Sequence, residues 1–193
     1  MIPSRERTAT TLTFLCTLVL GLQAVSAADP CRSGLEPGKR PGPYSFVMST
    51  GPQRGQSHCY ICETGDRPAV AIFARRMHNS LAKLVQQLDK AVSDHPKSDL
   101  RAWVTFLSED QLKLDPQIVG WSRQHAIRHV PLGVFEDTDG PPSYCLARDA
   151  DVTVLFFVKQ KVIANFAFRA GELTDDQIAA VMKSVPELVN DKK

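Results

Sequence analysis

The amino-acid sequence predicts an α/β fold in which helices on both faces cover a central mixed sheet. Two observations support this prediction. From residue 67 onward, short apolar runs alternate with segments whose apolar residues recur at helical spacing. Near the end of the chain, two long apolar runs flank a short polar turn, which is typical of an antiparallel hairpin. A chain of 193 residues can also bury one large core.

The first part of this domain reads as strand, helix, strand. Residues 70–73 form a continuous apolar run, as expected for a central strand that is covered on both faces. A helix follows, for which Asn79 or Ser80 supplies the cap and Pro96 the stop. A second strand is predicted over residues 101–107. The apolar face of the helix consists of Leu81, Leu84, Val85, Leu88 and Val92.

The middle of the domain predicts a second helix and a third strand. The helix spans residues 115–126, with Asp115 as its cap and Pro116 in its first turn. The strand spans residues 130–135, and a short helical stretch follows at residues 143–148.

The last third carries the clearest local signals. Residues 152–158 and 162–168 flank Lys159-Gln160-Lys161 and predict a hairpin. Residues 174–177 then match a capping box, so a final helix should pack over the sheet. Its apolar face consists of Ile178, Val181, Met182 and Val185.

The first 27 residues have the parts of a secretory signal peptide. A basic start precedes an apolar run over residues 12–22, and Val25-Ser26-Ala27 supplies small residues for cleavage. We therefore expect an exported chain, secreted or periplasmic, whose mature part begins near Ala28; an uncleaved anchor is the alternative. No later run is long enough to span a membrane, and Cys16 is lost with the leader.

The segment after the signal peptide differs in composition from the rest of the chain. Residues 28–55 are rich in Pro and Gly and predict an extended, flexible tether with a short strand at residues 44–48. Residues 56–193 carry the folded domain. The net charge is only +2, and basic residues are mixed with acidic ones, so we expect no nucleic-acid partner.

Cys59 and Cys62 form a C-x-x-C pair just before the first core strand. In an exported chain such a pair can be a redox disulfide, half of a metal site or a structural staple. Cys31 and Cys145 complete an even set of four, so a second disulfide, Cys31–Cys145, is a further expectation. Either of these two could instead serve as a resolving thiol, because four cysteines allow three pairings.

The order of elements over residues 67–189 resembles the thioredoxin-like superfamily, and its redoxin branch in particular. Residues 144–158, from Tyr144 through the apolar run, followed by Lys161-Val162-Ile163-Ala164, are similar to the redoxin segment in which a tyrosine-containing helix leads into the hairpin. The resemblance implies a three-layer thioredoxin-like sandwich. It also implies thiol-disulfide exchange with protein thiols or disulfides as partners.

Two features depart from the family pattern. In thioredoxins the C-x-x-C follows the first core strand, whereas residues 74–79 contain no cysteine here. The proline that is normally cis before the penultimate strand is also absent at residues 151–153. The sequence is therefore an atypical member of the pattern.

The leading hypothesis is that the loop around the cysteines folds over residues 75–79, so that Cys59 and Cys62 occupy the usual active-site area. Residues 63–68 read as a turn, so we expect no helix start that could lower a thiol pKa. His58 would help only when protonated. The more exposed thiol should attack and the other resolve; we expect Cys59 to attack, because Cys62 adjoins the acidic Glu63.

The competing interpretations are non-catalytic. The cysteines could form a structural disulfide in a thioredoxin-like binding or structural module. Alternatively, a zinc or copper site could use His58, Cys59, Cys62 and His78. Apart from that metal alternative, we expect no cofactor.

Overall fold

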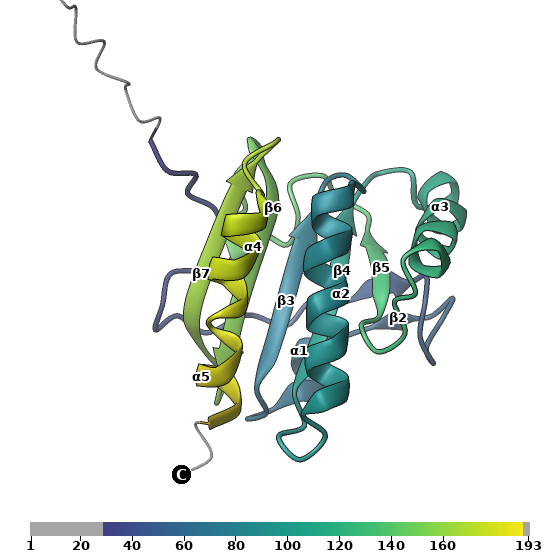
Figure 1. Ribbon diagram of the computed structural model, residues 1–193. Coiled ribbons are helices and arrows are strands. Elements are labelled where there is room, and N and C mark those ends of the chain that lie inside the picture. Colours follow the sequence, from purple (N-terminus) through teal and green to yellow (C-terminus); the bar gives the residue numbers. More distant parts are fainter. Residues whose placement is uncertain (1–28, 191–193) are drawn as a thin grey trace, which may run out of the picture.

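The computed structural model describes residues 29–190, so the expected signal peptide over residues 1–27 lies outside the described residues. The strands are β1 (Phe46–Met48), β2 (Ser57–His58), β3 (Ala69–Ala74), β4 (Arg101–Leu107), β5 (Leu132–Phe135), β6 (Ala150–Val158) and β7 (Lys161–Arg169) (Figure 1). The helices are α1 (Tyr60–Thr64), α2 (Asn79–Asp94), α3 (Gln111–Gln124), α4 (Asp175–Met182) and α5 (Val185–Asn190), with a 3-10 turn η1 (Pro142–Tyr144).

The seven strands form one mixed sheet in the order β2-β1-β5-β4-β3-β6-β7. Its centre is parallel, because β3 pairs with β4 and β4 with β5 in the same direction. β6 runs antiparallel to β3, and β7 antiparallel to β6. β1 joins the other side antiparallel to β5, where a Cβ on Gly133 would overlap the Val47 carbonyl oxygen, so this pairing requires glycine. The predicted α/β class with a mixed sheet is confirmed.

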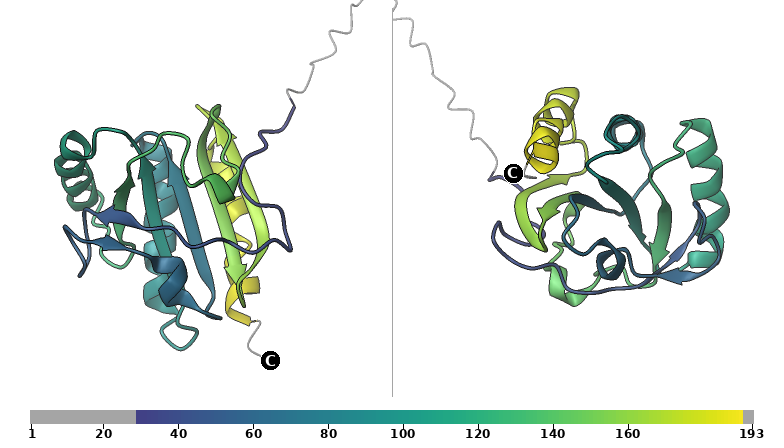
Figure 2. Two further views of the ribbon diagram at one scale, coloured as in Figure 1. Left: turned by 180° about the vertical axis from the view of Figure 1, so that it is seen from behind. Right: turned by 90° about the horizontal axis from the view of Figure 1, so that it is seen from below.

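The sheet has two differently covered faces, which we name after the helices on them. The α2 face carries α2, α4 and α5 over a mostly aliphatic core. The opposite α1 face carries α1, η1 and the N-terminal segment 29–45 (Figure 2). That face is rich in aromatic side chains, among them Tyr44, Phe73, Trp103 and Tyr144, all of which are buried.

The strongest sequence signals are confirmed. All six residues of β3 are buried, as the continuous apolar run predicts, and β4 has the predicted bounds. The hairpin forms with a turn of only two residues, since Lys161 already belongs to β7. Thr174 caps α4 and accepts the Gln177 N–H at 3.3 Å.

Two helix starts differ from the prediction. α2 is capped by His78, one residue before the expected Asn79 or Ser80, through its ring nitrogen. α3 begins at Gln111 with Asp110 as its cap, so the predicted start at Asp115 is wrong.

The N-terminal segment is extended as expected, but it is not a free tether. Leu35 and Tyr44 are buried against the α1 face. The Gly38 N–H donates to the Val162 carbonyl at 2.7 Å, and the Val162 N–H donates to the Lys39 carbonyl at 2.9 Å. Backbone hydrogen bonds with the β7 edge therefore fix this segment, which the prediction of a flexible tether missed.

Within residues 29–190, none of the helices combines the length and the apolar character that crossing a membrane requires.

Candidate active site

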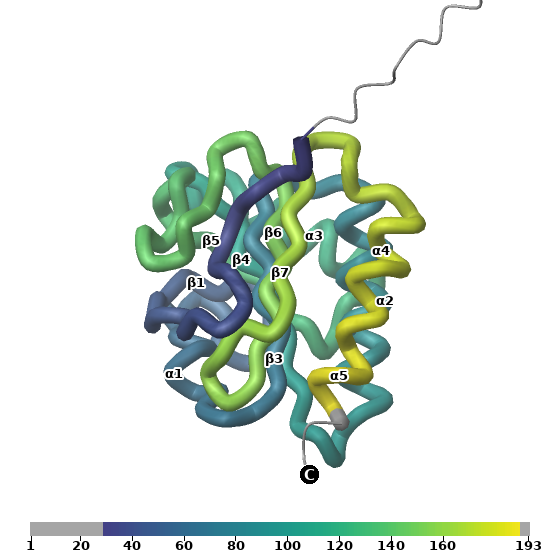
Figure 3. The backbone as a smooth tube through the Cα atoms, turned by 90° about the vertical axis from the view of Figure 1, so that its left-hand side faces the viewer, coloured from purple at the N-terminus to yellow at the C-terminus, as the bar shows by residue number. Residues whose placement is uncertain are grey.

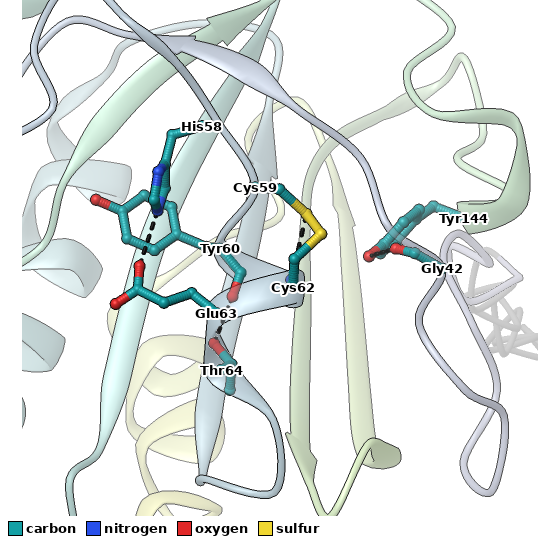
Figure 4. The surroundings of a disulfide bond; sticks show 8 residues. All are labelled: Gly42, His58, Cys59, Tyr60, Cys62, Glu63, Thr64 and Tyr144. Carbon is teal, nitrogen blue, oxygen red and sulfur yellow. Dashed lines mark hydrogen bonds and ion pairs between the residues drawn. A yellow bond between two sulfur atoms is a disulfide. The ribbon is translucent and has the colours of Figure 1, made fainter.

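Cys59 and Cys62 are joined by a disulfide at the start of α1, with their Cα atoms 5.4 Å apart (Figure 4). Cys59 is the N-cap of the helix, and its Sγ accepts the Cys62 N–H at 3.2 Å. Cys62 is exposed, whereas Cys59 is half-buried. The expectation that no helix starts here is therefore wrong. Cys62 is the more exposed cysteine, so exposure does not support the expected attack by Cys59.

Packing from the sheet holds α1 in place. The Tyr60 ring stacks on the buried Trp103 ring of β4, with centroids 5.3 Å apart and planes 20° apart. Burial, reinforced by the nearby Glu63 charge, raises the pKa of Tyr60 to about 12, so its phenol is neutral at pH 7. Inside the helix, the Thr64 hydroxyl donates to the Tyr60 carbonyl at 2.7 Å. A five-residue helix is thus anchored by tertiary contacts and not by its own length.

The negative charge of Glu63, the neighbour of Cys62, is balanced by an ion pair. Glu63 accepts from Arg101 Nη1 at 2.6 Å and lies 2.9 Å from His58 Nε2. The Arg101 hydrogen bond, opposed by desolvation and supported by His58, lowers the pKa of Glu63 below its usual range. Figure 4 shows the His58 ring directed toward Glu63 and away from the sulfur atoms. The expected electrostatic penalty at Cys62 is therefore reduced, because a guanidinium balances the carboxylate.

The cysteine pair does not lie at the usual redoxin position, which is the carboxyl end of β3. Strand pairing matches Ala69 with Arg101 at one end of β3 and Ala74 with Phe106 at the other, about 16 Å along the strand. The α1 contacts are with the Arg101 end, and α1 lies on the opposite face from α2 (Figure 2). The structure therefore does not fold the cysteine loop over residues 75–79, and this part of the leading hypothesis is wrong.

A polar network occupies that position instead. Arg75 donates to the carbonyls of Thr138, Ala147 at 3.0 Å and Ala150 at 2.9 Å. Arg76 makes a two-point ion pair with Asp151, at 2.9 and 3.1 Å, where the family carries its proline. No cis peptide bond occurs among the described residues.

His78 belongs to the same network. Its Nδ1 accepts the Leu81 N–H at 3.3 Å, and its Nε2 lies 3.4 Å from the buried Asp151 carboxylate. Desolvation lowers the pKa of His78, Asp151 opposes this shift, and Arg76 adds to it. A shallow hollow of about 260 Å³ lies beside these groups, lined by Arg76, Met77, His78, Ser80, Asp151, Gly171 and Leu173.

The four residues proposed as metal ligands are not brought together. Cys59 and Cys62 are bonded to each other, His58 pairs with Glu63, and His78 pairs with Asp151. Within residues 29–190, no group of three or more histidine, cysteine or acidic side chains is arranged to hold a metal ion.

The expected Cys31–Cys145 disulfide is not formed. Both thiols are free, Cys31 half-buried and Cys145 exposed. They nevertheless line one hollow of about 380 Å³ between the N-terminal segment and the turn before β6.

Sequence reasoning missed Tyr60, Arg101 and Trp103 as the groups that build the site. The available signal was weak: an aromatic residue between the two cysteines, and a basic residue at the start of a predicted strand. Only the parallel pairing of β3 with β4 brings these residues to α1.

Comparisons with solved structures relate the whole fold to known proteins. A proposed protein disulfide isomerase from Bacteroides thetaiotaomicron aligns with a TM-score of 0.61 at 14% identity, over 81% of this chain and 92% of its own. A proposed thiol:disulfide interchange protein DsbE from Chlorobium tepidum gives 0.59 at 10% identity, over 81% and 99%. The thioredoxin domain of a thiol-disulfide oxidoreductase from Bacteroides vulgatus gives 0.56 at 14%, over 78% and 99%.

The chain has a thioredoxin-like fold. No family model and no curated protein matches its sequence. Within this thioredoxin-like fold, the C-x-x-C pair lies on the α1 face, and an ion-pair network fills the loop after β3. The redoxin resemblance inferred from residues 144–164 is confirmed at the level of the fold.

Proposed function

We propose that this chain is an exported thiol-disulfide oxidoreductase that exchanges disulfides with protein thiols through Cys59 and Cys62. The observation that carries the proposal is the disulfide at the first turn of α1. One sulfur belongs to an exposed residue, and the other accepts a backbone N–H. Thiol-disulfide exchange needs an accessible sulfur and a stabilised thiolate; in this pair Cys62 is the exposed residue and Cys59 accepts the N–H.

In the reduced protein, the half-buried Cys59 is the attacking group in place of the more exposed Cys62, because its sulfur accepts a backbone N–H. The N–H of Cys62 that reaches its sulfur favours a thiolate there. The Cys59 thiolate attacks one sulfur of a substrate disulfide, forms a mixed disulfide and releases the first substrate thiol. Cys62 then attacks the Cys59 sulfur, which releases the second thiol and restores the Cys59–Cys62 bond. Two electrons and two protons pass to the substrate.

The short span of the bond also favours exchange chemistry over stabilisation. The cysteines are three residues apart, so the chain-entropy gain from this bond is only about 2 kcal/mol, less than for a long loop. Tyr60 stacking and the Glu63–Arg101 ion pair already hold α1 in place.

A non-catalytic thioredoxin-like module is the second candidate. The observation in its favour is the loop after β3, where Arg75 and the Arg76–Asp151 pair occupy the family's reaction site. In that case the Cys59–Cys62 bond is a structural staple, and the sheet serves only as a scaffold.

Reduction of a protein disulfide such as that of insulin, followed with dithiothreitol as electron donor, distinguishes the two. Exchange predicts that Cys59→Ser and Cys62→Ser each lower the catalysed rate at least about a hundredfold, because neither single thiol can complete both steps. Cys145→Ser is the matched control and keeps the wild-type rate. If the wild-type protein does not accelerate insulin reduction over dithiothreitol alone, the exchange activity is excluded and the non-catalytic module is supported.

Export is tested separately. Expression of the full chain in a bacterium with a periplasm should yield a mature protein whose N-terminal residue is near Ala28. Recovery of an unprocessed chain in the cytoplasm would contradict this part of the proposal.

A further inference from the structure

Two cysteines that the proposed exchange reaction does not use lie on the walls of one hollow. Cys31 belongs to the N-terminal segment, and Cys145 follows η1, roughly 115 residues later in the chain. The hollow has a volume of about 380 Å³. Figure 3 shows the N-terminal segment lying alongside β7. The fold has therefore placed two free thiols in one shared space.

The residues just after Cys31 are held firmly against the wall that carries Cys145. The Gly34 N–H donates to the Cys145 carbonyl at 3.1 Å. Ser33 Oγ lies 2.7 Å from Thr153 Oγ1 and accepts the Ala147 N–H at 3.0 Å. Gly34 has φ +91°, and a Cβ there would lie 2.7 Å from the Thr153 methyl, so only glycine fits. Cys31 is thus tethered two residues from a fixed point beside Cys145.

We propose that Cys31 and Cys145 are a second redox pair, which closes by a disulfide across this hollow and fastens the N-terminal segment to the turn before β6. The free thiols of the structure are the reduced form of this pair. Residues 29–32 belong to no helix or strand, so this part of the segment can close over the hollow without disturbing the sheet.

The oxidant is a low-molecular-weight disulfide, and the reaction is an exchange. The exposed Cys145 thiolate attacks one sulfur of the oxidant, forms a mixed disulfide and releases one thiol. Cys31 then attacks the Cys145 sulfur, which forms the intramolecular bond and releases the second thiol. The pair loses two electrons and two protons, and the oxidant is reduced to two thiols.

The surroundings suit these two roles. Burial, together with the Asp149 and Glu172 charges and against Arg169, raises the pKa of Cys31. Cys31 is therefore a poor first attacking group. Asn165 also lines the hollow, and its Oδ1 is buried without a hydrogen-bond partner among the described residues. This oxygen offers an acceptor for a thiol hydrogen in the reduced form.

The bond would have a large effect on stability, in contrast to Cys59–Cys62. Closing a loop of more than a hundred residues restricts the unfolded chain strongly, and the melting temperature should rise by roughly 5–10 °C on oxidation.

The test starts from the fully reduced mature chain, from about Ala28, which lacks Cys16; it is incubated with glutathione disulfide, alkylated and digested with trypsin. Cleavage after Arg32, Arg54, Arg128 and Arg148 places Cys31, the Cys59 and Cys62 pair, and Cys145 in three different peptides. We expect a cross-linked peptide that joins Cys31 to Cys145, and a melting temperature that rises with its formation. In Cys31→Ser, the Cys145 peptide should carry glutathione instead, and the melting temperature should rise only by the smaller amount that closure of Cys59–Cys62 supplies.

Three results would overturn the proposal: two thiols that stay fully alkylated after oxidation, two separate glutathione adducts in the wild type, or cross-links that join either cysteine to Cys59 or Cys62. Peptide mapping does not depend on the insulin assay, so this proposal and the proposed exchange activity can fail independently. Cys145→Ser provides a second variant should Cys31→Ser fold poorly.

Discussion

The starts of α1 and α2 have the same local geometry but carry different chemistry. In each, the capping side chain accepts the N–H of the residue three positions later: Cys59 Sγ from Cys62, and His78 Nδ1 from Leu81. α1 has five residues and depends on the Tyr60 stack on Trp103, whereas α2 has sixteen and buries a full apolar stripe. The redox-capable group thus lies on the shorter helix, which tertiary contacts hold in place.

In this thioredoxin-like sheet the cysteine pair lies on the α1 face, and the loop before α2 carries no cysteine. The loop before α2 instead holds the Arg76–Asp151 ion pair, with the His78 ring beside the same carboxylate. The start of α1 instead has an exposed cysteine, Cys62, and a carboxylate, Glu63, whose charge Arg101 balances. Four predictions test how separate the two helix starts are.

The largest expected effect comes from removing the anchor of α1. Tyr60→Ala deletes a buried ring and should lower the free energy of unfolding by about 3 kcal/mol, with a matching loss of insulin reduction. Tyr60→Phe keeps the ring and loses only the hydrogen bond to Gln53, so it should cost less than about 1 kcal/mol. Urea unfolding measures both. Equal losses in the two variants would show that stacking does not hold α1.

At α2 the corresponding substitution removes the N-cap residue, His78. His78→Ala should lower the free energy of unfolding by about 1 kcal/mol, because the Leu81 N–H loses its acceptor. His78→Asn restores an acceptor and should recover most of that loss. Neither variant should change the rate of insulin reduction by more than about twofold; a larger change would mean that the two helix starts cooperate.

A smaller effect is expected from the ion pair beside Cys62. Arg101→Met leaves the Glu63 charge unbalanced near the sulfur atoms, which should raise the thiol pKa and shift the alkylation profile to higher pH. The measurement is the pH dependence of iodoacetamide alkylation in the reduced protein. Lys83→Met, which breaks the Lys83–Asp175 pair on the α2 face, is the control and should leave the profile unchanged.

The smallest effect concerns pH and His78. The pKa of His78 is lowered in the folded protein, so the unfolded chain binds more protons as the pH falls below about 6.5. Stability is therefore greatest above that pH and is lost as the pH falls. Between pH 7.5 and 5.5, His78→Asn should lose about 1 °C less in melting temperature than the wild type, because partial exposure screens the imidazole. A wild type and a variant with parallel pH profiles would contradict the assignment.

Sequence patterns correctly predicted the elements whose signals lie among neighbouring residues. The apolar runs of β3 and β6, the helical spacing in α2 and the Thr174 cap all follow from residues that are neighbours in the chain. Hydrophobic periodicity and capping chemistry act over a few residues, so they can be recognised without knowledge of the fold.

The candidate site could be predicted only as a pair of cysteines. α1 has no apolar period of its own, and its stability comes from Trp103 and Arg101, about forty residues further along the chain. The side of the sheet on which it lies depends on that long-range packing. For this reason a segment whose sequence predicts a turn forms a short helix in the structure.

The start of α3 was missed for a different reason, because two capping residues compete. Pro116 suggested a start at Asp115, yet the structure uses Asp110 and places the proline inside the helix. The missing proline N–H leaves the Leu112 carbonyl without a helical donor, and Leu112 is 88% exposed, so water can satisfy that oxygen.

The contact between Tyr60 and Trp103 gives the protein a built-in optical probe. Trp103 is fully buried, and the residue stacked on it lies between the two bonded cysteines. The chain has one other tryptophan, Trp121, which packs on the α2 face against Phe106. In a Trp121→Phe variant, intrinsic emission would report from the indole beneath α1 alone, so opening and closing of the Cys59–Cys62 bond could be followed in real time without an attached dye.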